Sequence, residues 1–443
     1  MNDEGLADAS AANPFRLPRN HPGIRSGSTT ILQRVEFRNG APSRLRIYPM
    51  TVSRGREFLS IPGPTNIPDA VLTAMHRPAI DIYDGDMIAV THSLLEDLPK
   101  IFRTTGRTYI YAANGHGGWE AALTNVLSRG ETVLVLESGL FALGWGDMAR
   151  MMGVKVEVLK GDPRRAVDPV ALAQRLAADT AREIKAILVV QIDTASGVVN
   201  ELAAIHRAIA SVGHPALLMV DCVASLGCMP FAMDEWGIDV AMAGSQKGLM
   251  TPPGLAFVAA NERAHAVHEH ADLRTRYWDW TFRNGEAHYQ KYGGTPPQHL
   301  LFGLRKALDM LFEEGLDAAI RRHALLAEAT RHAVSRWAEA DALAFNIVRA
   351  EERANSVTTV LVHGREPSVI SDYCRLKCGV VLGRGIGDLQ GRAFRIAHMG
   401  HVNAPMVFGV LGAIEMALEA LGIPHGRGGV QAAVEYLGRE VRP

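Results

Sequence analysis

The sequence predicts an α/β fold in which a mostly parallel central sheet is covered by helices and is followed by a smaller C-terminal α+β domain. Between residues 108 and 260, near-continuous apolar runs typical of buried strands alternate with amphipathic runs typical of helices. From about residue 335 the pattern changes to strand-like runs, a short helix, a further strand-like run and two C-terminal helices. This change favours a second, smaller unit beside the main sheet.

The expected elements follow from these runs. Strands of the large sheet are expected at 108–113, 132–137, 154–159, 184–193, 216–221, 240–244 and 255–260. Helices are expected at 118–128, 146–153, 168–180 and 201–213, where apolar residues recur at helical spacing. A long helix over 296–316 connects to the second unit. We expect a large domain over 50–320 and a small C-terminal domain over 321–443.

Residues 1–49 do not fit this pattern. They contain scattered Arg, Pro, Ser and Asn, with no sustained apolar period and no apolar core of a secretory signal. We expect this stretch to be disordered, or to be sequence upstream of a natural start at Met50.

The composition limits the class of partner. The chain has 443 residues and a net charge of −1, so it lacks the basic surface that nucleic acid or an anionic membrane would attract. The longest apolar segment near the C-terminus, 404–422, carries Glu415 and Glu419 one helical turn apart, which favours a helix with a wet face over a membrane span. We expect small molecules and a second copy of the chain as partners.

Cysteine is rare in the chain, with four residues. Cys374 and Cys378 have the spacing of one helix face but lack the second pair that a structural zinc site needs. We therefore expect reduced thiols in a cytoplasmic protein, without a metal site.

The first strand-end motif is a glycine-rich loop, Asn114-Gly115-His116-Gly117-Gly118, which lies just before an expected helix. Ligands of parallel sheets bind beyond the carboxyl ends of the strands. Glycines before a helix let backbone N–H groups point at an anion, and the helix dipole adds partial positive charge. The loop matches neither a Walker loop nor a dinucleotide fingerprint. It indicates either a phosphate cradle or a tight strand-to-helix turn.

Two ionisable residues follow later strands. Asp221 ends the run 216–221, where a buried carboxylate needs a partner. A protonated pyridine nitrogen would be such a partner, and a turn-capping aspartate is the alternative. Lys247 follows the run 240–244, and its amine is either solvated or bonded covalently to an aldehyde. The cradle, the carboxylate and the lysine at one sheet edge together predict pyridoxal 5'-phosphate.

Several long stretches of the chain resemble the class V aminotransferases, among them "IPGPTNIPDAV", "GGWEAALTNVLSRGE", "MDEWGIDVAMAGSQKGLMTPPGL" and "FRIAHMG". The resemblance covers 57–440 and is closest to bacterial serine–glyoxylate and to alanine–glyoxylate aminotransferases. It implies the type I fold of pyridoxal-phosphate enzymes and a homodimer with active sites at the interface.

The resemblance also implies a role for individual residues around the cofactor. Lys247 matches the lysine that holds the cofactor and moves protons, and Asp221 matches the partner of the ring nitrogen. Phe141 matches the aromatic residue that stacks on the ring, and Thr194 lies where a hydroxyl approaches the ring oxygen. The residues matched to the phosphate are Asn114, Gly115, His116 and Gln246.

Three further residues are matched to the subunit interface and the substrate. Tyr292 and Thr295, in "YGGTPP", match residues that reach the phosphate of the neighbouring subunit. Arg395 matches the arginine that binds the substrate carboxylate, since a guanidinium can pair with a carboxylate through two hydrogen bonds.

The chain departs from the serine–glyoxylate enzymes at three places, which leaves the amino donor open. The cradle reads Asn-Gly-His-Gly instead of Ser-Gly-Thr-Gly, and 191–194 reads Gln-Ile-Asp-Thr instead of His-x-Glu-Thr. The segment 81–87, "DIYDGDM", stands where those enzymes carry Asp-His-Arg. This segment and "IAHMG" are similar to pyridoxamine–pyruvate aminotransferase.

The implied reaction is a ping-pong transamination from serine, alanine or a similar small amino acid to glyoxylate or pyruvate. Pyridoxamine or aspartate is the alternative donor. A lyase such as a cysteine desulfurase is a further alternative and would need a mobile nucleophilic cysteine. A cofactor-sensing regulator would need a DNA-binding module, for which 1–49 shows no helix-turn-helix pattern.

Overall fold

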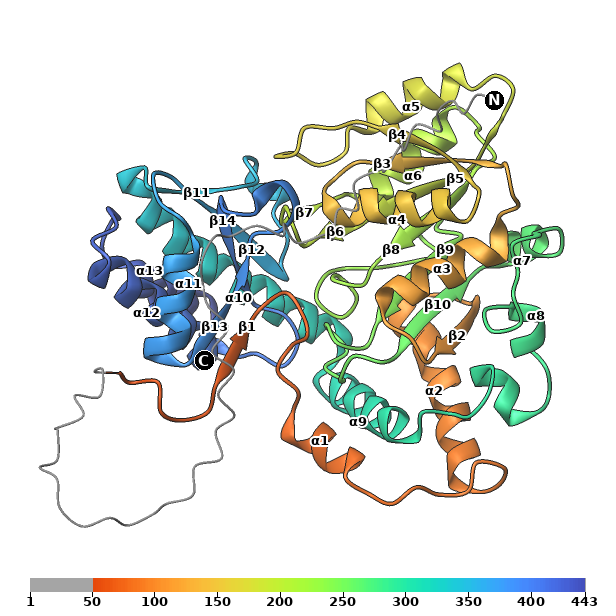
Figure 1. The fold of residues 1–443 in the computed structure, drawn as a ribbon, viewed down its shortest axis with the longest axis horizontal. Helices are drawn as coiled ribbons and strands as arrows, with labels where there is room; N and C mark the ends of the chain where they lie inside the picture. Colours follow the sequence, from red (N-terminus) through yellow and green to blue (C-terminus); the bar gives the residue numbers. More distant parts are fainter. Residues whose placement is uncertain (1–50, 443) are drawn as a thin grey trace, which may run out of the picture. The chain divides into compact units, whose positions relative to one another are not determined.

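The computed structural model describes residues 51–442, which contain two main sheets and a small β-ribbon (Figure 1). The ribbon pairs β6 (Ile192–Asp193) with β7 (Val198–Val199). The N-terminal stretch 1–49 and Met50 lie outside the described residues, so the expectations for them stay predictions.

The larger sheet has seven strands and carries the strand ends singled out in the sequence. Five neighbouring strands pair in parallel, and β10 is antiparallel to both β2 and β9. Across the sheet the order is β2 (Arg107–Tyr111), β10 (Ala256–Ala260), β9 (Val240–Gly244), β8 (Leu217–Asp221), β5 (Ile184–Val190), β3 (Thr132–Leu136) and β4 (Lys155–Leu159).

Helices cover both faces of this sheet because its strands are apolar on both sides. Leu134 and Leu136 of β3 pack into one core, while Val133 and Val135 pack into the other. One face is covered by α3 (Gly115–Val126), α4 (Leu140–Met151) and α7 (Glu262–His268). The opposite face is covered by α2 (Asp86–Phe102), α5 (Pro169–Ala178), α6 (Leu202–Ser211) and α9 (Gln298–Glu314).

The smaller sheet has five strands and its own core. Across it the order is β1 (Phe58–Ser60), β13 (Val380–Arg384), β14 (Ala393–Ala397), β12 (Val357–Val362) and β11 (Leu343–Phe345). Its core also contains residues of α10 (Leu316–Trp337), α11 (Ser368–Tyr373), α12 (Ala404–Ala420) and α13 (Gly429–Glu440). Shorter elements are α1 (Asp69–Met75), α8 (Trp280–Arg283), η1 (His288–Tyr292), η2 (Ala338–Ala340), η3 (Ala350–Glu352), the π-helical turn η4 (Cys374–Cys378) and η5 (Gly387–Leu389).

The predicted α/β fold with a mostly parallel sheet and a smaller α+β part is confirmed. Two strands of the smaller sheet, β1 and β13, have no counterpart among the expected elements. They pair with each other in parallel across more than 300 residues of sequence, with Phe58 opposite Val380. β1 has only three residues, and β13 has no alternation of apolar and polar residues, so neither gives a period-2 signal of its own.

Of the two acidic residues on the apolar helix α12, Glu419 is exposed, as expected for a wet face, whereas Glu415 is half-buried and hydrogen-bonded within the protein. Glu415 accepts hydrogen bonds from the Nε1 of Trp337 at 3.3 Å and from the backbone N–H of Val430 at 2.9 Å. A carboxylate near the start of α13 interacts favourably with that helix dipole. Among residues 51–442, no helix is both long and apolar enough to span a bilayer.

The packing of β10 gives a test of this fold. Val258 is fully buried between β2 and β9, so Val258→Ala should lower the free energy of unfolding by about 1.5–3 kcal/mol. Val170 at the start of α5 is 64% exposed, so Val170→Ala should change it by less than about 0.5 kcal/mol. Urea titration of both variants measures the difference, and equal losses would contradict the burial assigned to β10.

Candidate active site

The candidate site lies at the carboxyl ends of the neighbouring strands β8 and β9. Asp221 is the last residue of β8 and pairs in register with Met242 of β9. The chain then leaves β9 at Gly244 and reaches Lys247 three residues later. Parallel pairing therefore brings both ionisable residues to the same sheet edge, as the sequence predicts.

Lys247 has a largely desolvated amine. Its Nζ donates a hydrogen bond to the carbonyl oxygen of Pro62, in the loop that follows β1. Gly63 of this loop lies so close that a Cβ on it would be 2.5 Å from the Cε of Lys247. Burial, together with the positive charge of Arg395, lowers the pKa of Lys247 to about 8. A substantial fraction of the amine is therefore neutral near physiological pH.

Asp221 is buried with both carboxylate oxygens hydrogen-bonded. Its Oδ1 accepts from the backbone N–H of Val223, and its Oδ2 accepts from the Nε1 of Trp119, each at 2.7 Å. Burial raises the pKa of Asp221 to about 6, while these two donors and the charge of Lys247 act in the opposite direction. Each carboxylate oxygen keeps a further lone pair for a donor in the site.

The glycine-rich loop forms the start of helix α3. Asn114 is the N-cap, and its side chain accepts a hydrogen bond from the N–H of Gly117 at 3.2 Å. A Cβ on Gly118 would lie 2.7 Å from the Cε of Met242, so this glycine allows the helix to pack closely on β9. Gly115 is buried, and His116 is exposed with its ring 4.6 Å from that of Trp119. Burial and the charge of Lys247 lower the pKa of His116.

Gln246, which precedes Lys247, is fixed through its backbone. Its carbonyl oxygen accepts from the N–H of Thr65 at 3.1 Å. The side-chain Oε1 is buried and has no hydrogen-bond partner within residues 51–442. A buried polar atom of this kind indicates a missing partner, such as a bound ligand.

Arg395, in strand β14 of the smaller sheet, places its positively charged guanidinium near Lys247. Its Nη1 donates to the carbonyl oxygen of Thr194 at 2.9 Å, and its Nε donates to that of Arg384 at 2.8 Å. Both acceptors are neutral carbonyl oxygens. The guanidinium also forms no salt bridge with any residue of 51–442. Burial lowers the pKa of Arg395 to about 10, and the group stays charged at neutral pH.

The carboxylate of Asp193 contacts the backbone of Phe141 and acts on Arg395 through its charge. Its carboxylate accepts from the N–H groups of Phe141 at 2.8 Å and of Ala195 at 2.9 Å, and it raises the pKa of Arg395 through its charge. A Cβ on Gly139 would lie 2.5 Å from the Asp193 carboxyl carbon. The carboxylate therefore holds the start of α4, which carries Phe141, against the Thr194 turn.

Within residues 51–442, no hydrogen bond connects Tyr292 or Thr295 to Lys247. The Tyr292 hydroxyl hydrogen-bonds to the Oγ1 of Thr91 at 2.7 Å, and Thr295 is exposed. Thr91 also meets the Nε2 of His288, whose Nδ1 donates to the carbonyl oxygen of Ile82. This network joins the "YGGTPP" segment to the segment 81–87. Their contact with a neighbouring subunit stays a prediction.

Three features of the site have no signal in the sequence. Trp119 reads as one more apolar position of a helix, yet its indole contacts Asp221. Asp193 ends the expected strand 184–193, but no pattern in the sequence indicates that its carboxylate holds two site elements. The carbonyl of Pro62, which meets Lys247, comes from a loop 185 residues earlier.

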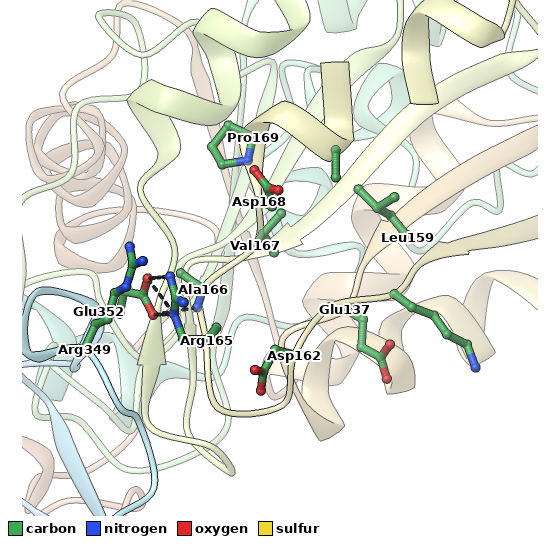
Figure 2. Close-up of a pocket in the computed structure, with 13 residues that line it drawn as sticks. Glu137, Leu159, Asp162, Arg165, Ala166, Val167, Asp168, Pro169, Arg349 and Glu352 are labelled. Atoms are coloured by element: carbon green, nitrogen blue, oxygen red, sulfur yellow. Dashed lines mark hydrogen bonds and ion pairs between the residues drawn. The ribbon is translucent and has the colours of Figure 1, made fainter. Parts of the chain in front are cut away.

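A separate cavity of about 520 Å³ lies between the loop after β4 and the turn η3 (Figure 2). Arg165 and Glu352 pair across it, with Nε to Oε2 at 2.8 Å. Glu137, Asp162, Asp168 and Arg349 also line it. None of the predicted site residues is among its lining residues, and the mixed charges do not favour one class of ligand.

Comparison with known proteins agrees with this geometry. The family described as aminotransferase class-V matches residues 58–387. A serine–glyoxylate aminotransferase of Methylorubrum extorquens is 39% identical, covering 86% of this chain and 96% of the relative. An L-aspartate–glyoxylate aminotransferase of Paracoccus denitrificans is 36% identical, covering 85% and 95%.

Among solved structures, the pyridoxamine–pyruvate aminotransferase of Mesorhizobium loti is similar with a TM-score of 0.81 and 27% identity. The match covers 89% of this chain and 100% of that chain. The architecture is therefore the type I fold of pyridoxal-phosphate enzymes, and the chain belongs to the class V aminotransferases.

Proposed function

We propose that this aminotransferase uses pyridoxal 5'-phosphate to move an amino group from serine, alanine or a similar small amino acid to glyoxylate or pyruvate. The observation that carries the proposal is the desolvated Lys247 amine at the same sheet edge as the buried Asp221. The similarity to glyoxylate aminotransferases supports the acceptor. The reaction runs in two half-reactions, so that the donor's 2-oxo acid leaves before the acceptor binds.

The residues present fit the cofactor. Lys247 offers a partly neutral amine for an aldehyde, and Asp221 offers a buried carboxylate for a ring nitrogen. The start of α3 at Gly115 offers backbone donors for a phosphate. The buried side-chain amide of Gln246, with its unpartnered Oε1, needs a further polar partner in the same place.

When bound, the cofactor supplies an electron sink for the bond-breaking at the donor's Cα. Lys247 then acts as the base: its Nζ takes the Cα proton and later returns a proton. A pKa of about 8 suits both directions of transfer near neutral pH. The carbonyl of Pro62 accepts a hydrogen bond from this Nζ.

Arg395 binds the carboxylate that donor and acceptor share. Its guanidinium is preorganised by the carbonyls of Thr194 and Arg384, and neither of these neutralises it. A carboxylate in this place fixes the orientation of Cα toward Lys247. Such positioning is a large part of the rate gain in enzymes of this kind.

Asp221 and Phe141 are the two residues that act on the ring of the cofactor in this proposal. The ionised carboxylate of Asp221 stabilises a proton on a ring nitrogen, which strengthens the electron sink. Phe141, at the start of α4, provides an apolar face, and the Asp193 carboxylate fixes its backbone. Asn114 and His116 complete the phosphate end in this proposal.

The assembly we propose is a cytoplasmic homodimer with active sites at the interface. In it, Tyr292 and Thr295 lie beside the phosphate of the neighbouring subunit. The hydrogen bonds of Thr91 to Tyr292 and His288 support this assembly, since they fix the "YGGTPP" segment within a single subunit.

The second candidate is the same chemistry with another amine donor. The similarity to the pyridoxamine–pyruvate and L-aspartate–glyoxylate enzymes favours pyridoxamine or aspartate. A desulfurase needs an accessible nucleophilic thiol, and it is disfavoured because Cys222, Cys228 and Cys374 are buried. Burial raises the pKa of Cys228 to about 11 and that of Cys374 to about 12, so neither is a thiolate at neutral pH.

A half-reaction screen tests the donor. The cofactor-loaded protein is mixed with single amines, and loss of the visible absorbance reports conversion of the cofactor to its amine form. Serine or alanine should convert it, and glyoxylate or pyruvate should restore the band. Conversion by pyridoxamine or aspartate alone would replace the first candidate by the second, and sulfide release from cysteine would contradict both.

Arg395 gives a second test. Arg395→Lys loses the paired hydrogen bonds to a carboxylate, so kcat/KM for the amino acid should fall about 10- to 100-fold. Arg384→Lys on the adjacent strand is the matched control, because that side chain is 66% exposed and pairs with Asp372. It should stay within about threefold of the parent. Pyridoxamine has no carboxylate, so the rate of its half-reaction alone, measured without a 2-oxo acid, should be unaffected in Arg395→Lys. Equal losses in both variants would remove Arg395 from the substrate site.

A further inference from the structure

Trp119 lies between the two ends of the proposed cofactor site. It is the fifth residue of α3, directly after the glycine-rich loop, and is 3% exposed. Its Nε1 donates to the Oδ2 of Asp221 at 2.7 Å across 102 residues of sequence. The opposite oxygen of Asp221 is held by the N–H of Val223, also at 2.7 Å.

The indole is fixed by rings on its other sides. It stacks on Trp145 with the planes 15° apart and the centroids at 6.1 Å. His116 meets it edge-on at 4.6 Å, and Phe141 meets it edge-on at 6.4 Å. Aromatic contacts of this kind favour one ring orientation. The N–H therefore has a defined direction, toward the carboxylate.

We propose that Trp119 is a positioning residue for this reaction: its indole N–H holds the Asp221 carboxylate in the orientation that the cofactor ring nitrogen requires. The inference rests on the proposed function, because it assigns Asp221 to that nitrogen. Through Trp119, the N-terminal part of α3 serves the ring end of the cofactor as well as the phosphate end.

The bond also affects the charge of Asp221. Burial in this place favours the neutral acid, and each N–H donor favours the ionised form. The charged and titratable groups that face the carboxylate are Lys247, Asp193 and Cys222, with His116 beyond the indole. Removal of one donor therefore raises the pKa of Asp221 further above its ordinary value and lowers the ionised fraction at neutral pH.

Trp119→Phe tests the proposal, and Trp145→Phe is its matched control. Both tryptophans are buried and stacked on each other, but the Nε1 of Trp145 has no hydrogen-bond partner within residues 51–442. The two substitutions remove the same ring atoms, and only the first removes a hydrogen bond. A structural effect of the smaller ring should appear in both.

The first readout is the apoprotein. The carboxyl carbon resonance of Asp221, assigned by its loss in Asp221→Asn, should titrate about one pH unit higher in Trp119→Phe than in the parent. Trp145→Phe should leave the midpoint in place. The second readout is the dissociation constant for pyridoxal 5'-phosphate, which should rise about tenfold in Trp119→Phe and less than twofold in the control. Equal behaviour of the two variants would overturn the proposal.

A measurement on the parent chain covers the case in which Trp119→Phe does not fold. The indole N–H resonance of Trp119 should shift with pH at the midpoint of Asp221, while that of Trp145 should not. An unshifted Trp119 resonance would overturn the proposal. Failure of the proposed function looks different: the parent would then take up no cofactor, while the titration in the apoprotein would still report the contact between Trp119 and Asp221.

Discussion

The structure depends on the burial of two ionisable groups, the Lys247 amine and the Asp221 carboxylate, at one edge of a parallel sheet. Each group is costly to desolvate alone, and each is shifted toward its neutral form. The pairing of β8 with β9 fixes where both chain segments end, so neither group can leave without disrupting the sheet. In the proposed function, a cofactor that bonds to the amine and pairs with the carboxylate would relieve both costs.

The surrounding elements act on these two groups from several directions. The loop after β1 reaches Lys247 through Pro62, although β1 belongs to the smaller sheet. Strand β14 of that sheet contributes Arg395, whose guanidinium donates to the carbonyl of Thr194, directly after β6 of the small β-ribbon. Contacts between these parts of the chain therefore bring Arg395 near Lys247. In the proposed function, substrate orientation depends on both sheets.

The sequence predicts the parts of this site that follow a strand or precede a helix. Asp221, Lys247 and the Asn114 loop could be found because apolar runs end beside them, and parallel strands bring such ends together. The contact of Trp119 with Asp221 spans 102 residues, and that of Thr91 with Tyr292 spans 201. A tryptophan in an amphipathic helix looks the same whether its N–H meets a carboxylate or nothing, as Trp145 demonstrates. The pairing of β1 with β13 is hidden for the same reason, since long-range register leaves no local pattern.

The most direct test of the central claim locates the cofactor on the chain. The protein is loaded with pyridoxal 5'-phosphate, reduced with borohydride and digested, and the modified peptide is identified by mass spectrometry. Our interpretation requires one modified peptide, carrying the added mass on Lys247, and no reducible visible band in Lys247→Ala. A reduced adduct on another lysine, or an unchanged band in the variant, would contradict it.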